Sequence, residues 1–282
     1  MRRPFVVSDK TGYRIVRGEA KREGEECDGS VTDVHECALC RLDRRFPTGD
    51  RLVELLRRGE SLQGAPEGAH VCRAFNRIEP DAVRVVVLGQ DPYPDIAQAT
   101  GRAFEDGRWS TEDRPQDLAS SLKPLMLAAW ATQQNHSGAF RSGGWPEIVL
   151  RRDFALPDPG THFDALAEQG VLFVNVAWTR TGSSHLAAHR SFWEPVLGYM
   201  LGKLARCNQP VVFLLLGEDA RDAFCSADPV CNRSAIVYNA HPGRGGFYSR
   251  NNPLVRVNQA LGTLDAPQSI DWWPHQQAHP GE

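Results

Sequence analysis

Four short apolar segments, separated by stretches long enough for helices, constrain the fold more than any other feature. They are VRVVVLG (83–89), VLFVNVAW (171–178), VVFLLLG (211–217) and AIVYNAHP (235–242). Each is rich in β-branched or aromatic residues and nearly continuous rather than alternating, which is typical of parallel strands covered on both faces. We therefore predict a three-layer α/β/α fold with a central four-stranded, mostly parallel sheet.

The chain divides into three parts by composition. Residues 1–45 are polar and charged with weak periodicity, so we interpret them as an N-terminal extension of unknown role. Residues 46–273 hold all four apolar segments and are long enough to bury one large core. The His-, Gln- and Pro-rich residues 274–282 are predicted to form a flexible tail.

Composition excludes several classes of protein. The net charge of −3 argues against a strongly basic protein that coats nucleic acid, although a local basic groove remains compatible with it. No apolar run reaches membrane-spanning length and the N-terminus has no secretory pattern, so we expect no membrane association. Seven cysteines, an odd number, do not suggest a disulfide framework. We expect a cytoplasmic protein, and the excess of Arg over Lys points to a bacterial source.

Polar side chains follow the predicted strands directly. Gln90, Asp91 and Tyr93 come after the first strand, Asn175 ends the second, and His241 follows the fourth. In an open α/β sheet, ligands bind at the carboxyl ends of the strands. A carboxylate, a carboxamide and an imidazole at one edge suit a polar, planar ligand and acid–base or electrostatic catalysis.

These segments resemble the motifs of the family 1 uracil-DNA glycosylases. The motifs are GQDPYP, VLFVNVAWT and AHPGRGG, and VVFLLLGEDAR and SIDWW also fit their places in the family's order. The resemblance covers roughly residues 70–273. It implies a uracil-DNA glycosylase-like fold and hydrolytic removal of uracil from single- or double-stranded DNA, the first step of base-excision repair. It also implies a monomer that needs no metal or cofactor.

The resemblance implies a role for each pocket residue, because uracil must leave the base stack before its glycosidic bond can be reached. Phe104 would stack on the flipped base, and Asn175 would pair with O4 and N3–H of uracil. Cytosine presents the reversed donor and acceptor pattern and would leave buried groups unpaired. Tyr93 would fill the space of the thymine methyl group, and Gln90 would line the pocket.

The resemblance also implies two catalytic residues. Asp91 would stabilise the sugar cation and orient the attacking water, and His241 would donate a hydrogen bond to uracil O2 as it gains charge. The matching motifs hold no amine nucleophile, so we expect hydrolysis without strand cleavage.

The chain departs from the family pattern at three places. Pro94 stands where the family has His, and Glu218 stands where it has a phosphate-contacting Ser. The loop that carries an apolar wedge in the family contains Arg244, Gly245 and Phe247 instead. We predict that these three residues contact DNA and that Arg244 or Phe247 fills the vacated stack.

Two other functions stay open. A binding protein on the same fold could capture uracil or abasic DNA with little turnover, because Pro94 and Glu218 alter the active edge. A small-molecule hydrolase could use the same strand ends. The chain has neither a glycine-rich phosphate loop nor a Ser or Cys nucleophile elbow, which counts against the hydrolase.

The cysteines raise the alternative that the protein binds a metal. Four thiolates could hold zinc or an iron–sulfur cluster. Other uracil-DNA glycosylase families carry an iron–sulfur cluster, whereas the family 1 pattern does not. The spacing of the cysteines is irregular, and free buried cysteines are common, so we favour no metal. The candidate ligands would be Cys27, Cys37, Cys40 and Cys72.

Overall fold

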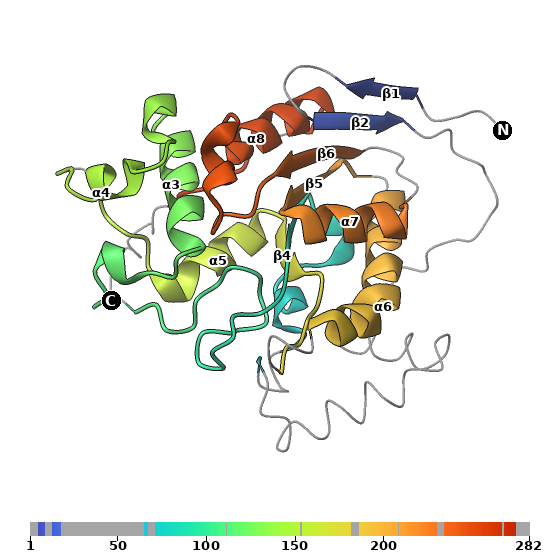
Figure 1. Ribbon diagram of the computed structural model, residues 1–282. Helices are drawn as coiled ribbons and strands as arrows, with labels where there is room; N and C mark the ends of the chain where they lie inside the picture. The colour runs from blue at the N-terminus through green and yellow to red at the C-terminus, as the bar shows by residue number, and fades with distance from the viewer. Residues whose placement is uncertain are drawn as a thin grey trace, which may run out of the picture.

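A computed structural model describes most of the chain after residue 70. The described residues are 5–8 and 13–17 (backbone), 65–66, 71–110, 112–152, 154–181, 186–207, 209–229, 234–266 and 268–274. They form one sheet of six strands in the order β1-β2-β6-β5-β3-β4, with helices packed against it (Figure 1).

Four neighbouring strands are parallel, which confirms the predicted core of the sheet. β3 pairs with β4 on one side and with β5 on the other, and β5 pairs with β6. Their bounds are β3 (Val85–Gly89), β4 (Val171–Asn175), β5 (Val211–Leu216) and β6 (Ser234–Asn239).

The sheet is wider than predicted, because a hairpin from the N-terminal extension joins it. β1 (Phe5–Ser8) and β2 (Tyr13–Arg17) pair with each other, and β2 pairs with β6, both antiparallel. Figure 1 shows this hairpin at the top edge of the sheet, beside β6. The predicted four-stranded parallel core is therefore confirmed, and the hairpin extends the sheet to six strands.

The two faces of the sheet pack into two separate cores, which explains the continuous apolar runs. Val85 and Val87 of β3 belong to one core, and Val86 and Leu88 belong to the other. Because successive side chains of a strand point to opposite faces, a strand covered on both sides must be apolar throughout.

Helices on each side complete these cores. α3 (Leu122–Gln133), α5 (Pro159–Glu168) and α8 (Pro253–Thr263) contribute buried residues to the first core. α6 (Leu186–Arg206) and α7 (Glu218–Ala227) contribute to the second and lie on the opposite side of the sheet in Figure 1. The remaining helices among the described residues are short: α4 (Gly144–Ile148), η2 (Arg73–Phe75), η3 (Pro80–Ala82), η4 (Pro115–Asp117), η5 (Ser137–Ala139) and η7 (Gly245–Ser249).

Two helices begin at side-chain caps followed by proline. The Asp158 carboxylate accepts the backbone N–H of Thr161 at the start of α5, and Asn252 accepts that of Leu254 at the start of α8. A proline at the first helical position has no N–H to leave unpaired. Among the described helices, none combines the length and the apolar character that crossing a membrane requires.

The first core contains a buried histidine, His162 of α5. Its ring lies among those of Trp109, Phe163 and Trp273, and its Nδ1 has no hydrogen-bond partner in the described part of the chain. Burial lowers the pKa of His162 from 6.5 to about 4. The native state therefore holds the imidazole neutral where the unfolded chain would begin to protonate it.

We expect this histidine to make the protein less stable in acid. Between pH 6.5 and pH 4 the unfolded state binds the extra proton, so the free energy of unfolding falls as the pH falls. The loss from this one group is roughly 2 kcal/mol at pH 5 relative to pH 8. Urea unfolding at pH 5 and at pH 8 gives the free energy of unfolding at each pH, and the difference between the two should be about 2 kcal/mol smaller in His162→Leu than in the wild type. The exposed His136→Gln should leave it unchanged, and an undiminished difference in His162→Leu would contradict the assignment.

Candidate active site

The strand ends predicted to carry the chemistry lie at one edge of the sheet. In the parallel register, Gly89 of β3 is aligned with Asn175 of β4, and Leu216 of β5 with Asn239 of β6. Pairing continues past β3, because the carbonyl of Gln90 accepts the N–H of Ala177 at 3.2 Å. Gln90 is therefore held by its backbone against the segment that leaves β4.

Asn175 and Phe104 meet above Gly89. A Cβ atom on Gly89 would lie 2.5 Å from Asn175 Oδ1 and 3.1 Å from Phe104 Cε2. The absence of a side chain at Gly89 is therefore what lets the two residues come this close. Asn175 is 6% exposed and Phe104 is 7% exposed. The structure thus brings together a carboxamide and an aromatic ring that the sequence places 71 residues apart.

Phe104 has a left-handed backbone with φ of 66°, which non-glycine residues adopt at a cost. Its ring lies 5.8 Å from that of His241, and its carbonyl accepts the Tyr93 hydroxyl at 3.2 Å. The Tyr93 oxygen is also 3.0 Å from Ser121 Oγ. Burial raises the pKa of Tyr93 well above its usual value, so the phenol keeps its proton and anchors the Phe104 turn.

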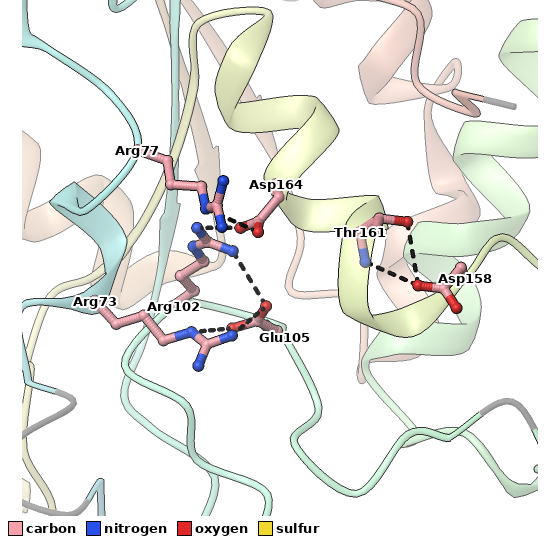
Figure 2. A network of polar contacts seen from close by, with 7 residues as sticks. All are labelled: Arg73, Arg77, Arg102, Glu105, Asp158, Thr161 and Asp164. Atoms are coloured by element: carbon pink, nitrogen blue, oxygen red, sulfur yellow. Dashed lines mark hydrogen bonds and ion pairs between the residues drawn. The ribbon is translucent and has the colours of Figure 1, made fainter. Parts of the chain in front are cut away.

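The residues on either side of Phe104 are fixed by an ionic cluster in which Arg102 and Glu105 are buried and Arg73 and Arg77 are partly exposed (Figure 2). Arg102 lies between two carboxylates, at 2.6 Å from Asp164 of α5 and 3.2 Å from Glu105. Arg77 pairs with the other oxygen of Asp164 at 2.9 Å, and Arg73 pairs with Glu105 at 3.2 Å. These contacts tie the Phe104 turn to η2 and α5, which offsets its strained backbone.

Asp91 is paired with Arg180, which belongs to none of the motifs described above. Arg180 Nη1 lies 2.6 Å from Asp91 Oδ2, and the side chains are 18% and 6% exposed respectively. Pro94, at the family's histidine position, is exposed and has no hydrogen-bonding side chain. The sequence carried no signal for the pair, because it depends on how the loop after β4 folds back.

The loop after His241 determines which ring nitrogen of the histidine carries the proton. Its Nδ1 accepts the backbone N–H of Gly243 at 3.1 Å, which leaves the proton on Nε2. Burial and, secondly, the charge of Arg244 lower the pKa of His241, against smaller opposing effects of Asp91 and Asp219. The imidazole is therefore a neutral hydrogen-bond donor through Nε2 at neutral pH.

Close approach of the segments that follow β5 and β6 positions this histidine. A Cβ atom on Gly217 would lie 3.2 Å from His241 Cβ, and the φ of Gly217 is +105°, where glycine is favoured. Glu218 follows at the exposed start of α7. A carboxylate at that place presents negative charge where the family contacts phosphate.

The predicted DNA-contacting loop divides into exposed and buried residues. Arg244 and Gly245 are exposed, whereas Phe247 is completely buried against Phe140, with ring centroids 5.4 Å apart. The carbonyl of Phe247 also accepts the Asn239 side chain at 2.8 Å. Phe247 is a core residue, so the expectation that its side chain contacts DNA or enters the base stack is corrected. Arg244 is the remaining candidate of the two.

The predicted metal ligands are only partly described. Cys27, Cys37 and Cys40 lie outside the described residues. Cys72 is buried in the second core, where burial raises the pKa of its thiol to about 11, so it behaves as a small apolar side chain. Within the described ranges, no group of three or more His, Cys, Asp or Glu side chains could hold a metal ion.

Known proteins similar to this chain are uracil-DNA glycosylases. The protein of that name from Mycolicibacterium vanbaalenii is 31% identical over 215 residues, covering 73% of this chain and 80% of that protein. Uracil-DNA glycosylase 1 of Streptomyces avermitilis is 33% identical over 214 residues, with the same coverage of 73% and 80%.

Solved structures show the same fold at lower identity. Mimivirus uracil-DNA glycosylase superposes with a TM-score of 0.58 at 18% identity, covering 84% of this chain and 85% of that one. Wild-type UNG from Nitratifractor salsuginis gives a TM-score of 0.54 at 22% identity, covering 78% and 87%. The family model of the uracil DNA glycosylase superfamily matches residues 75–262. This chain therefore belongs to the uracil DNA glycosylase superfamily.

Proposed function

We propose that this protein is a uracil-DNA glycosylase that hydrolyses the bond between uracil and deoxyribose and leaves an abasic site in DNA. The observation that carries the proposal is the convergence of Asn175 and Phe104 above Gly89, at the same sheet edge as Asp91. The names of the relatives support the same activity.

The pocket residues would select uracil by shape and by hydrogen bonding. Phe104 offers a ring on which a flipped base stacks, and the Asn175 amide offers one donor and one acceptor. Tyr93 is anchored through its hydroxyl to the Phe104 carbonyl, so it has a fixed position from which to exclude a 5-methyl group. Gln90, held through its carbonyl, would line the pocket beside them.

The chemical step needs two charges stabilised at once. As the bond from C1′ to uracil N1 breaks, its electron pair leaves with uracil, and the sugar becomes cationic. The Asp91 carboxylate would stabilise that cation and orient a water whose oxygen bonds to C1′ and whose proton is released. His241 would donate its Nε2–H to uracil O2, where negative charge accumulates.

Contacts with DNA would be local, in keeping with the net charge of −3. Arg244 and Gly245 are exposed beside His241, so this loop would meet the backbone or the vacated stack. We propose that the protein acts as a monomer in the bacterial cytoplasm and accepts single- or double-stranded DNA.

The test is excision from a labelled single-stranded oligonucleotide with one uracil, followed by alkali. We expect strand breaks that need both the protein and alkali, and none with thymine or cytosine at the same place. An excess of uridine monophosphate should compete poorly, which separates a DNA enzyme from a nucleotide hydrolase. Breaks without alkali, or none at all, would overturn the proposal.

One observation favours a second candidate, a low-turnover protein that binds uracil or abasic DNA. If the Arg180 cation served only to neutralise Asp91, the sugar cation would meet a weaker negative field and turnover would be slow. Tight, uracil-dependent binding without alkali-labile breaks would establish this alternative.

Filling the space above Gly89 is expected to abolish most of the activity. In Gly89→Ala the new methyl group would lie 2.5 Å from Asn175 Oδ1, so Asn175 or Phe104 must move. Displacing positioning groups by about 1 Å costs on the order of 100-fold in rate, which single-turnover excision would measure. Gly262→Ala is the matched control, because a Cβ there meets nothing within 4 Å. Equal rates in the two variants would contradict the proposed pocket.

A further inference from the structure

The Asp91 carboxylate has a charged partner that is itself shielded from water. Arg180 Nη1 and Asp91 Oδ2 are 2.6 Å apart, and the side chains are 18% and 6% exposed. Truncating one member of a pair this shielded is strongly destabilising, because the other member is left buried without its partner. The pair therefore differs from surface pairs such as Arg114 with Asp117, whose side chains are 71% and 44% exposed.

The arginine is presented from a segment fixed on both sides. The backbone N–H of Arg180 donates to the carbonyl of Ala65 at 2.8 Å, and the N–H of Ala65 donates to the carbonyl of Arg180 at 2.7 Å. The preceding Thr179 hydroxyl accepts Trp193 Nε1 of α6 at 2.8 Å and lies 2.8 Å from His189 Nδ1. The guanidinium thus projects from a fixed backbone position.

The pair involves one oxygen of the carboxylate, so the ion pair itself does not occupy Oδ1. A carboxylate held by Oδ2 keeps its second oxygen for a water molecule, which the proposed hydrolysis requires. Pro94 offers no side-chain donor for this task.

We propose that Arg180 is the positioning residue for Asp91: it holds Oδ2 and thereby orients the second oxygen, Oδ1, toward the attacking water. This role rests on the proposed function. Arg180 acts through Asp91 rather than on the substrate, because its positive charge would oppose the sugar cation. Its removal should therefore lower kcat and leave KM nearly unchanged.

The test compares Arg180→Gln, Arg180→Lys, Asp91→Asn and the Asp91→Asn/Arg180→Gln double variant in steady-state excision of uracil. We expect Arg180→Gln to lower kcat about 10- to 100-fold and to leave KM within about 3-fold of the wild-type value. Arg180→Lys, which keeps the positive charge, should recover much of the lost kcat. The double variant should be about as slow as Asp91→Asn alone, because the arginine has no second route to the reaction. Arg114→Gln, which breaks the exposed pair, is the matched control and should retain wild-type kinetics.

Three results would overturn the role. The first is a wild-type kcat in Arg180→Gln. The second is a raised KM with unchanged kcat in that variant, which would indicate a DNA contact. The third is a double variant whose loss equals the sum of the two single losses in free energy. If Arg180→Gln does not fold, the Asp91→Asn/Arg180→Gln double variant, which leaves no unpaired charge in the pair, carries the test: a kcat equal to that of Asp91→Asn supports the role, and a further loss overturns it. A wild-type chain that excises no uracil would overturn the proposed function and this role together, whereas an active wild type with an equally active Arg180→Gln would overturn this role alone.

Discussion

Asp91→Asn is expected to lower the rate of uracil excision by about 1,000-fold or more while leaving binding of uracil-containing DNA largely intact. The carboxamide has nearly the shape of the carboxylate but carries no charge to stabilise the sugar cation. It also accepts a proton from water poorly. Because the side chain is only 6% exposed, bulk solvent would not replace the missing charge.

Single-turnover excision from a uracil oligonucleotide measures this rate, and anisotropy of the same labelled DNA measures binding. Asp117→Asn is a suitable control, since Asp117 lies in the exposed ion pair with Arg114. A loss of less than about 10-fold in Asp91→Asn would show that another group carries the chemistry.

Arg102→Met is expected to destabilise the fold by about 3–5 kcal/mol, the cost of breaking a buried ion pair by removing one partner. The Arg102 side chain is 3% exposed and contacts both Glu105 and Asp164. Its loss leaves two carboxylates close together with only Arg73 and Arg77 to compensate them. Methionine keeps much of the volume, so the effect reports the charge rather than a cavity.

Urea unfolding measures the loss of stability directly. Arg114→Met removes an arginine from an exposed pair and should change the unfolding midpoint little. We also expect the excision rate of Arg102→Met to fall at temperatures where the variant is folded, since Arg102 and Glu105 flank the strained Phe104 turn. Stability equal to that of Arg114→Met would contradict the structural role of the cluster.

The parallel sheet and the meeting of its polar ends were predictable because their signals are local. Continuous apolar runs indicate strands buried on both faces, and the carboxyl ends of parallel strands share an edge. The alignment of Gly89 with Asn175 follows from that rule once the strands are placed. The resemblance to a family then supplied Phe104, whose local sequence alone indicates only a core residue.

Contacts set by the folding of loops were not predictable. Nothing around Arg180 indicates that its segment pairs with Ala65 and returns to Asp91. Similarly, the sequence around Arg102 and Glu105 is typical of surface charges, and only the packing of α5 and η2 against them buries the pair. Phe247 was misplaced for the opposite reason: its polar, glycine-rich neighbours suggested an exposed loop, whereas a single aromatic side chain packs into the core. The β1–β2 hairpin lies in a segment whose polar composition masked its strands.

The most direct test of the account is whether the wild-type chain produces alkali-labile sites only where an oligonucleotide carries uracil. The proposed function predicts abasic sites in the uracil strand, free uracil released in equal amount, and neither product from matched thymine or cytosine strands. Intact uracil strands after prolonged incubation with excess protein would contradict the assignment of Asp91, Asn175 and His241 to uracil excision.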